Sequence, residues 1–304
     1  MNKTIKHILL TGGTGLIGGK LTKQLLAKEY QVSHLSRERG KDPQVKTFLW
    51  DVDKGTIDEQ CIDGVDIIVH LAGAAIADKP WTKERKKLII DSRTKSIGLI
   101  YQLLKNKTNQ VKKVVSASGI GYYGDKGDEL LTEDSEPAHD FLGTCCIAWE
   151  QAVDEGKALR LSLVKFRTGV VLTKDGGALP QFAKLIKYGV GTPIGSGKQW
   201  VPWIHWQDVV DMYIHGIENE NFTGVYNMVA PNQINNIQMT AAIAKQLHKP
   251  LWLPHMPAFI LNLIMGEMSS FVLSSTRVSS KKVEDAGFTF KYPDISAALR
   301  EIYG

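Results

Sequence analysis

A glycine-rich segment near the start of the chain has the spacing of a phosphate-binding turn. The run GGTGLIG follows an apolar strand-like run, His7–Leu10, and opens a helix-like stretch, Leu16–Lys28. Glycines at this spacing permit a tight turn and bring backbone N–H groups close to a pyrophosphate, and the helix N-terminus adds partial positive charge. The strand–turn–helix context favours a dinucleotide site over a turn that binds nothing. The turn residues expected to contact the cofactor are Gly12, Thr14, Gly15, Leu16, Ile17 and Gly18.

The end of the second expected strand indicates which dinucleotide the turn would bind. Val32–Leu35 is followed by Ser36 and Arg37, with no carboxylate at the strand end. A site that prefers NAD usually places an acid there to bond the ribose 2′-hydroxyl, whereas a guanidinium suits a 2′-phosphate. Ser36 and Arg37 therefore favour NADP(H), with Arg39 as a further cation. The alternative is that Arg37 is an ordinary surface arginine.

Further cofactor contacts are expected at the ends of the other strand-like runs. Asp51 follows the third run and is placed to meet an adenine edge, unless it is a turn residue. Leu71, Ala72 and Gly73 follow the fourth run, where a glycine lets the chain pass close to a dinucleotide or simply ends the strand. The expected set is completed by residues at the ends of two later runs, Ala117 and Arg167.

Strand-like and helix-like segments alternate along the first half of the chain. Amphipathic stretches such as Lys83–Lys105 separate short apolar runs. Strict alternation predicts an α/β protein with a Rossmann doubly wound parallel sheet, covered by helices on both faces. We expect residues 1–170 to form this nucleotide-binding domain, which also receives 204–230. Residues 171–304 are expected to form mainly a smaller C-terminal, substrate-side lobe, with 250–304 as a small helical domain.

Composition and charge favour an ordinary globular protein. The 304 residues are 43% hydrophobic and 23% charged, with a net charge of +5. Lysines and arginines are scattered, so no nucleic-acid partner is expected. The apolar run Pro257–Leu273 is interrupted by Glu267, which indicates a buried helix or a lobe interface and no membrane partner. Cys61, Cys145 and Cys146 have no metal-ligand spacing, so we expect no metal, and they suit the reducing cytoplasm.

Several motifs together give a family resemblance over nearly the whole chain. TGGTGLIG at 11–18, HLAG at 70–73, SASGIGYYG at 116–124 and WIHWQDV at 203–209 resemble an extended short-chain dehydrogenase/reductase. RTGVVL at 167–172 and the tail GEMSSFVLSSTRV…AGF are similar to the atypical branch of NAD-dependent epimerase/dehydratase-like proteins that ends in a small C-terminal domain of unknown function. The resemblance implies a Rossmann domain, NADP(H), and a substrate cleft over the carboxyl ends of the strands.

One departure from the family pattern bears directly on the chemistry. Family members carry a Tyr and a Lys one helical turn apart, where the Tyr exchanges a proton and the Lys lowers its pKa and holds the ribose. Counting back from Glu150, these places fall on Leu142 and Cys146. Leucine has no proton to exchange and a thiol supplies no fixed positive charge, so these residues do not support the usual hydride-transfer mechanism.

Three hydroxyl groups remain as catalytic candidates. Ser118 occupies the place of the family's catalytic Ser and could hydrogen-bond a substrate oxygen. Tyr122 or Tyr123 could donate a proton, provided that the loop brings its hydroxyl within about 3 Å of that oxygen. The alternative is a polar strand end and two tyrosines packed under the rim of the cleft.

The substrate pocket is expected to draw on the segments 81–93 and 195–205. Trp81 and Arg93 lie before and on the long expected helix, and Trp203 and His205 belong to an aromatic stretch that could wall a pocket. Each of these residues taken singly is more often structural. His205 is also explained as a histidine satisfied by nearby Asp208.

Two functions compete. The cofactor pattern and Ser118 favour an NADP(H)-dependent oxidoreductase or epimerase acting on a small polar carbonyl or a sugar-nucleotide-like substrate. The absent Tyr/Lys pair favours a non-catalytic NADP(H)-binding sensor or regulatory protein, and the intact turn disfavours a module that has lost its ligand. A homodimer through the long helix is compatible with its apolar positions, which serve equally well as core: Leu99, Ile100, Leu103 and Leu104. We favour the enzyme, with substrate and direction open.

Overall fold

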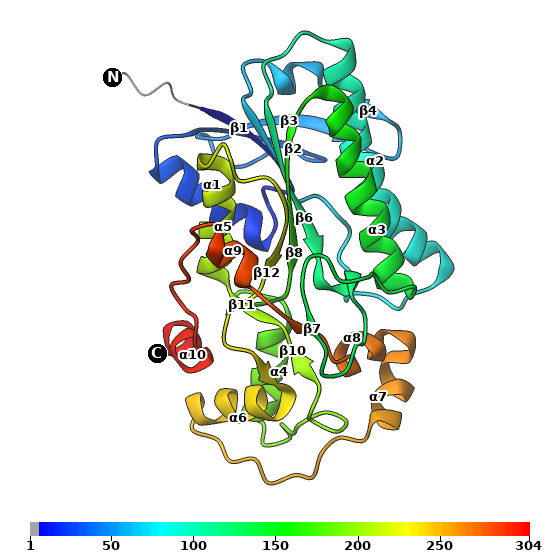
Figure 1. The fold of residues 1–304 in the computed structure, drawn as a ribbon, viewed down its shortest axis with the longest axis vertical. Helices are drawn as coiled ribbons and strands as arrows, with labels where there is room; N and C mark the ends of the chain where they lie inside the picture. The colour runs from blue at the N-terminus through cyan, green and yellow to red at the C-terminus, as the bar shows by residue number, and fades with distance from the viewer. Residues whose placement is uncertain (1–5) are drawn as a thin grey trace.

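The computed structural model describes residues 6–304, so the first five residues of the expected nucleotide-binding domain lie outside it. Within that range, eight strands form one large sheet (Figure 1). Neighbouring strands are parallel except for the last edge pair, which is antiparallel. This confirms the predicted α/β doubly wound sheet, whose strand order reverses between β1 and β5. From edge to edge the strands are β12 (Gly224–Met228), β8 (Ser162–Thr168), β6 (Lys113–Gly119), β5 (Ile67–His70), β1 (His7–Thr11), β2 (Gln31–Ser36), β3 (Lys46–Asp51) and β4 (Thr56–Ile57).

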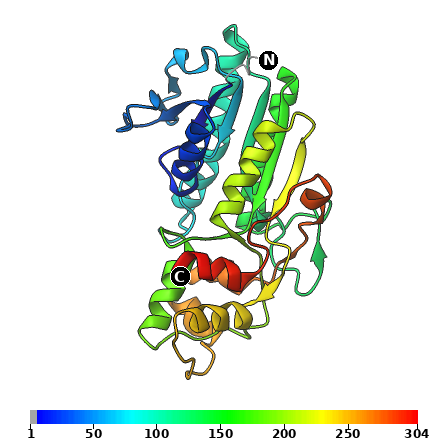
Figure 2. The same ribbon diagram turned by 90° about the vertical axis from the view of Figure 1, so that its left-hand side faces the viewer.

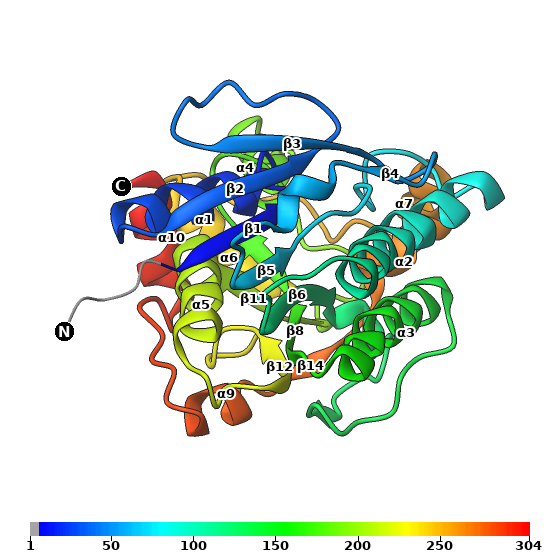
Figure 3. The ribbon, with the colours of Figure 1, turned by 90° about the horizontal axis from the view of Figure 1, so that it is seen from above.

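Helices cover both faces of this sheet (Figure 3). The central strands are buried on both sides, which is why all five residues of β1 (HILLT) are buried and its apolar run Ile8–Leu10 is continuous instead of alternating. One face packs against α1 (Leu16–Ala27) and α5 (Trp206–Glu218), and the other against α2 (Lys83–Asn106) and α3 (Phe141–Asp154). Helix α3 begins at Phe141, where the Asp140 carboxylate caps it by accepting the Gly143 N–H at 2.7 Å.

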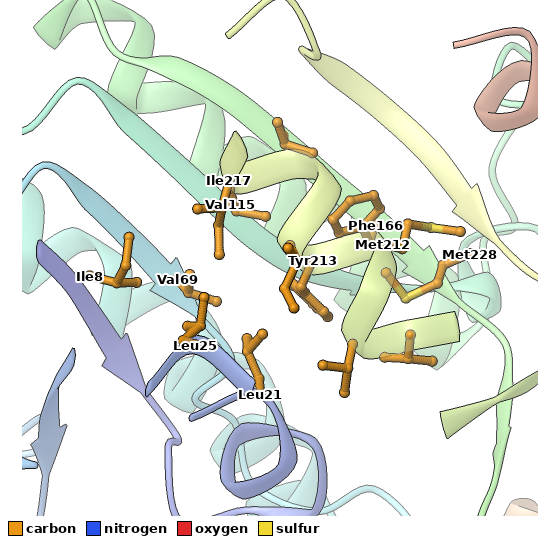
Figure 4. Packing of buried hydrophobic residues seen from close by; sticks show 14 of the residues in the cluster. Ile8, Leu21, Leu25, Val69, Val115, Phe166, Met212, Tyr213, Ile217 and Met228 are labelled. Carbon is orange, nitrogen blue, oxygen red and sulfur yellow. The ribbon is translucent and has the colours of Figure 1, made fainter. Parts of the chain in front are cut away.

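The core on the α1 and α5 face joins segments from both halves of the chain (Figure 4). Phe166 of β8 meets Tyr213 of α5 edge-on, with ring centroids 5.1 Å apart. Leu21 and Leu25 of α1 are fully buried in the same cluster. On the opposite face, Ile100, Leu103 and Leu104 of α2 are buried in the core of the chain itself, while Leu99 is partly buried against it. These α2 side chains therefore serve as core.

A smaller lobe lies beyond one end of the sheet (Figures 1 and 2). Its core is formed by α4 (Ala178–Lys187), α6 (Asn236–Gln246) and α10 (Ile295–Tyr303). A capping box fixes the start of α6, because the side chain of Asn235 accepts the Gln238 N–H and the side chain of Gln238 accepts the Asn235 N–H. Short strand pairs tie the connecting loops together: β9 (Val170–Leu172) with β11 (Trp203–His205), β10 (Trp200–Val201) with β13 (Ile234–Asn235), and β7 (Leu130–Leu131) with β14 (Arg277–Val278).

The tail beyond residue 250 packs against both parts of the molecule instead of only against itself. Helix α10 completes the lobe core, whereas Val283 of α9 (Lys281–Asp285) and the following Phe288 enter the main core beside the sheet. Helices α7 (Ala258–Met265) and α8 (Ser269–Leu273) precede α9 in the chain.

The expected burial of the run Pro257–Leu273 is wrong for α7. The side chains of Phe259, Leu263 and Ile264 are 70%, 86% and 72% exposed, and Leu261 is the buried residue of this helix. A short helix that is apolar all round gives no sequence signal for which side faces the core, so hydropathy alone misplaced it. No helix within residues 6–304 has both the length and the apolar character needed to cross a membrane.

A buried histidine links β5, β6 and α2. His70 Nδ1 lies 3.1 Å from Ser116 Oγ, and Nε2 lies 2.8 Å from Ser96 Oγ. Burial, with a smaller contribution from the charge of Arg93, lowers the pKa of His70 to about 3. The imidazole is therefore neutral in the folded protein at neutral pH.

Lowering the pH is expected to destabilise the protein through His70. Its pKa is 6.5 when unperturbed and about 3 in the folded protein, so between these values the unfolded chain binds the extra proton. Stability present above pH 6.5 is therefore lost as the pH falls, by about 2 kcal/mol between pH 7 and 5 from this group. Urea unfolding at both pH values should show a smaller loss for His70→Gln than for the wild type. An equal loss in the two proteins would contradict the assignment.

Candidate functional site

The glycine turn lies between β1 and α1, and its geometry leaves no room for side chains. Gly12 has a φ of 69°, and a Cβ at Gly18 would lie 2.2 Å from the Gly12 carbonyl oxygen. The Gly15 N–H donates to that same oxygen at 3.0 Å. Helix α1 then begins with no side-chain cap and no acidic residue in its first turn. Its first N–H groups are therefore open to an anion such as a pyrophosphate.

Buried polar side chains that the sequence analysis did not single out support this turn. His34 of β2 lies directly under it, because a Cβ at Gly13 would be 2.3 Å from His34 Nε2, which also lies 2.8 Å from Thr22 Oγ1 of α1. Thr11 Oγ1 accepts the N–H groups of Leu71 and Ala72, each at 3.1 Å. The segment after β5 is thereby held against the turn. A polar residue inside an apolar strand run was the available signal for His34.

The ends of β2 and β3 differ in how free their polar groups are. Ser36 ends β2, and the exposed Arg37 that follows makes no ion pair with any residue in 6–304. Its guanidinium is therefore available to a ligand. Asp51 instead serves the turn after β3, where its Oδ1 accepts the N–H groups of Asp53 and Lys54 at 3.1 and 3.0 Å. The backbone bond from Lys54 is the largest cause that lowers the pKa of Asp51.

Ser118 and Tyr123 belong to a buried polar network behind the strand ends. Ser118 Oγ donates to Glu150 Oε1 at 2.8 Å, and Arg167 donates to the two Glu150 oxygens from Nε and Nη2 at 2.8 and 3.0 Å. Nη1 of Arg167 donates to the Tyr123 hydroxyl and to the Glu133 carbonyl, both at 3.0 Å. All three guanidinium nitrogens thus donate to protein oxygens, and Arg167 is 3% exposed.

This network engages two of the three hydroxyl groups expected to be catalytic, those of Ser118 and Tyr123. Tyr123 is fully buried and donates to Asn227 Oδ1 at 2.7 Å, and burial raises the pKa of Tyr123 to about 12. Tyr122 packs its ring 3.4 Å from the guanidinium carbon of Arg167. Burial lowers the pKa of Arg167, but the hydrogen bonds and charge of Glu150 outweigh it and raise that pKa. The structure therefore uses Ser118, Tyr123 and Arg167 to join β6, β8 and α3.

The places where the resemblance implies a Tyr and a Lys lie next to the loop after β6. A Cβ at Gly121 would be 3.0 Å from Leu142 Cβ, and a Cβ at Gly119 would be 3.6 Å from Cys146 Sγ. Burial is the largest cause that raises the pKa of Cys146 to about 12, so its thiol carries no charge at neutral pH. Neither residue supplies the missing proton or cation.

The expected substrate residues Trp81 and Arg93 are held by contacts on the α2 side. Trp81 Nε1 donates to the Ile76 carbonyl at 2.9 Å, and its ring lies 4.9 Å from that of Phe141. Arg93 is buried over the ring of Trp149 at 4.9 Å, and its Nη1 donates to the Ala74 and Ile89 carbonyls. Both side chains shape the loop that follows β5.

Trp203 and His205 are buried within the lobe junction. Trp203 Nε1 donates to the Asn232 carbonyl at 3.1 Å. His205 Nε2 lies 2.9 Å from Glu301 Oε2, so its carboxylate partner is Glu301 and not Asp208. Asp208 instead accepts the N–H groups of Lys291 and Tyr292, at 2.7 and 3.0 Å. Residue 301 is far away in the sequence, so local spacing could not reveal this pair.

A cavity of about 120 Å³ lies where the loop after β6 and the start of α3 meet the lobe. None of the four expected substrate residues lines it. Asp140 is the one ionisable residue in its wall, which the sequence analysis did not single out. The wall consists of Ile120, Gly121, Gly124, Asp140, Leu142, Val170, Ala178, Phe182, Trp200, Val201, Pro202, Asn236, Met239, Ser270, Phe271, Val272, Ser274 and Thr276. Residues 6–304 contain no group of three or more His, Cys, Asp or Glu side chains placed to hold a metal ion.

The first helix of the doubly wound sheet opens with a turn in which Gly12 and Gly18 have no room for a side chain. This arrangement defines a dinucleotide-binding Rossmann protein. The chain belongs to the NAD dependent epimerase/dehydratase family, whose model matches residues 8–229, and a domain of unknown function (DUF1731) matches residues 256–302. It is thus an NAD(P)-dependent epimerase-family protein, which confirms the resemblance stated from the motifs.

Relatives over nearly the whole chain carry the same family name. The epimerase family protein YfhF of Bacillus subtilis is 34% identical over 97% of both chains. An Arabidopsis thaliana relative, the chloroplastic epimerase family protein SDR39U1 homolog, is 34% identical over 97% of this chain and 86% of its own length. The solved structure of the human epimerase family protein SDR39U1 with NADPH has a TM-score of 0.86, with 29% identity over 98% of this chain and 99% of that one. A Bacillus cereus UDP-glucuronic acid 4-epimerase complex, 17% identical over 98% of each chain with a TM-score of 0.78, shows the shared fold.

Replacing Gly18 with Ala is expected to distort the turn and abolish dinucleotide binding. The new methyl group would lie 2.2 Å from the Gly12 carbonyl oxygen, so the backbone must move. Gly19→Ala is the matched control, because the nearest atom to its Cβ would be 3.8 Å away. Within a helix, Ala is favoured over Gly by about 0.5–1 kcal/mol, so this control should raise the melting temperature. Cofactor fluorescence and thermal unfolding would measure both variants, and unchanged binding by Gly18→Ala would contradict the role of the turn.

Proposed function

We propose that this protein is an NADP(H)-dependent oxidoreductase or epimerase that acts on a small carbonyl compound or the corresponding alcohol. The supporting observation is that the glycine turn and the cavity meet at the start of α4. A Cβ at Gly176 would lie 3.5 Å from Leu16 of the turn, and Ala178, two residues later, lines the cavity. A dinucleotide with its pyrophosphate on the turn would therefore extend close to the cavity.

The residues present fit NADP(H). The uncapped N–H groups at the start of α1 suit the pyrophosphate, and Ser36 with Arg37 suits the 2′-phosphate. Leu71, Ala72 and Gly73 follow β5, and Ala117 lies near the end of the neighbouring strand β6, beside the proposed path of the cofactor. The human SDR39U1 structure contains NADPH, whereas UDP-sugar epimerase structures of the same fold contain NAD. When bound, the cofactor supplies or accepts a hydride.

Asp140 is the group that we propose handles the proton. Its Oδ1 is fixed as the cap of α3 by the Gly143 N–H, and Asp140 also lines the cavity next to Leu142. In the oxidising direction the Asp140 carboxylate would accept the hydroxyl proton of an alcohol, while the C–H bond at the same carbon breaks and its hydride passes to bound NADP⁺, so that the alcohol becomes a carbonyl. This role replaces the expected one of Ser118, Tyr122 and Tyr123, whose polar or aromatic groups are used within the protein.

Removing the charge of Arg37 is expected to weaken NADPH binding selectively. Arg37→Ala should lose about 1–3 kcal/mol for NADPH, about fivefold to 150-fold in Kd, because a charge-assisted contact to the 2′-phosphate is removed. NADH binding should not change. Fluorescence titration with each cofactor provides the measurement, and Lys54→Ala, an exposed cation at the turn after β3, is the control. An equal loss for both cofactors would contradict the 2′-phosphate assignment.

Asp140→Asn tests the proposed proton transfer. Asparagine caps a helix about as well as aspartate, so folding and NADPH binding should persist. Turnover should fall by about 10²-fold or more, because an amide cannot accept the proton. Steady-state assays with NADP⁺ and an alcohol panel measure this, with Asp134→Asn as an exposed control in the preceding loop. Turnover unaffected in Asp140→Asn would eliminate Asp140 as the base.

A specific observation favours a second candidate, a non-catalytic NADP(H) sensor. Leu142 and Cys146 leave the usual positions of the proton donor and the cation without a polar group. Single-turnover mixing of the NADPH complex with a broad carbonyl panel separates the two candidates. Oxidation of bound NADPH supports the enzyme, and tight binding without any oxidation supports the sensor.

We also propose a reducing location such as the cytoplasm. All three cysteines, Cys61, Cys145 and Cys146, are buried free thiols. Burial raises the pKa of each of them, which keeps them in the inert thiol form.

A further inference from the structure

The cavity wall has an unusual electrostatic character for a family that includes sugar-nucleotide enzymes. None of the residues in the wall is Lys, Arg or His, and Asp140 contributes a negative charge. Most of the other side chains are aliphatic or aromatic, such as Val170, Phe182 and Met239. A diphosphate in this cavity would meet a carboxylate and no cation.

Helix N-termini offer no substitute for a cation here. Helix α3 begins at the cavity, but the Asp140 carboxylate already caps it. Helix α6 begins there as well, and the Asn235–Gln238 capping box satisfies its first N–H groups. Helix α4 has no side-chain cap, and Ala178 at its start lines the cavity, two residues after Gly176, which approaches Leu16 of the glycine turn. We assign the free N–H groups of α4 to the proposed cofactor, which leaves a phosphate of the substrate with no second uncapped N-terminus among α3, α4 and α6.

Two basic side chains near the cavity, Arg277 and Lys86, interact with other residues of the protein instead of lining the cavity. Arg277 stacks on the ring of Trp200 at 4.8 Å and donates from Nε to Gln233 Oε1 at 2.7 Å. It lines a small neighbouring crevice and not the cavity. Lys86 donates to both Glu267 oxygens at 2.6 Å, which ties α2 to the segment before α8.

The size of the cavity limits its ligand further. Its volume is about 120 Å³. An apolar cavity of roughly 150 Å³ in another protein holds one benzene molecule. A single six-membered ring or a short branched chain therefore fills this space, whereas most of a nucleotide sugar would have to lie outside it.

We propose that the cavity binds a small, uncharged, largely apolar carbonyl compound or alcohol, about the size of one ring and without phosphate. Its hydroxyl faces Asp140, which accepts a hydrogen bond, and its hydrocarbon part packs on Val170, Phe182 and Met239. The inference rests on the proposed function in taking this cavity as the substrate site. It separates this chain from the UDP-sugar complexes that share its fold, and it departs from the polar or sugar-nucleotide substrate expected from the sequence.

Calorimetric titration of the full-length protein with cyclohexanol, cyclohexanone and UDP-glucose tests this proposal, with and without saturating NADPH. Val272→Trp fills the cavity from α8, and Leu185→Trp is the matched control, since Leu185 is 43% exposed on α4 and outside the wall. Circular dichroism and NADPH titration of both variants verify that fold and cofactor site persist. The expected result is saturable binding of cyclohexanol or cyclohexanone that weakens about tenfold or more in Val272→Trp and not in Leu185→Trp. UDP-glucose should not compete.

The outcomes separate this inference from the proposed function. Tight NADPH binding with preferential binding of UDP-glucose, lost in Val272→Trp, overturns the apolar substrate and leaves the proposed function standing. Absence of binding by both ring compounds, or equal binding by both Trp variants, also overturns it. Binding of a ring compound by a protein that binds no NADPH supports the cavity assignment and overturns the proposed function.

Discussion

The contact between the first helix and the turn before it sets the geometry on which the rest of the site depends. At Gly18 the backbone of α1 lies so close to the Gly12 carbonyl that a single Cβ would approach it to 2.2 Å. Because the two segments are so close, the free N–H groups at the start of α1 lie near the ends of β1 and β5. His34 packs under the turn, and Thr11 binds the segment that follows β5, so both side chains support this contact. The cofactor site is therefore a property of backbone packing, with side chains acting mainly as supports.

A buried charge pair joins the ends of β6 and β8 to α3 at the other side of the site. Glu150 and Arg167 are 6% and 3% exposed and bind each other through two hydrogen bonds, and Ser118 donates to the same carboxylate. Removing one partner of such a pair would leave an uncompensated buried charge, at a cost of about 3–5 kcal/mol. The hydroxyl groups at this strand end are thereby committed to the protein interior. The ionisable residue that lines the cavity is instead Asp140, at the cap of α3.

The sequence predicts those parts of the molecule that depend on patterns of neighbouring residues. The continuous apolar runs and the glycine spacing each lie within a dozen or so residues, and they predict the sheet, the turn and the start of α1. The pairing of His205 with Glu301 and the exposure of α7 depend on segments that meet only in three dimensions. Asp140 is recognisable locally as a helix cap. Its place in a cavity wall arises because α4, α6 and α8 arrive from later in the chain.

A crystal structure of the protein with NADPH is the most direct test of the account. The account predicts the pyrophosphate on the N–H groups from Gly12 to Ile17, the 2′-phosphate at Arg37, and the nicotinamide at the mouth of the cavity beside Gly121 and Leu142. A nicotinamide ring bound away from this cavity, or a cofactor that does not engage the glycine turn, would contradict it.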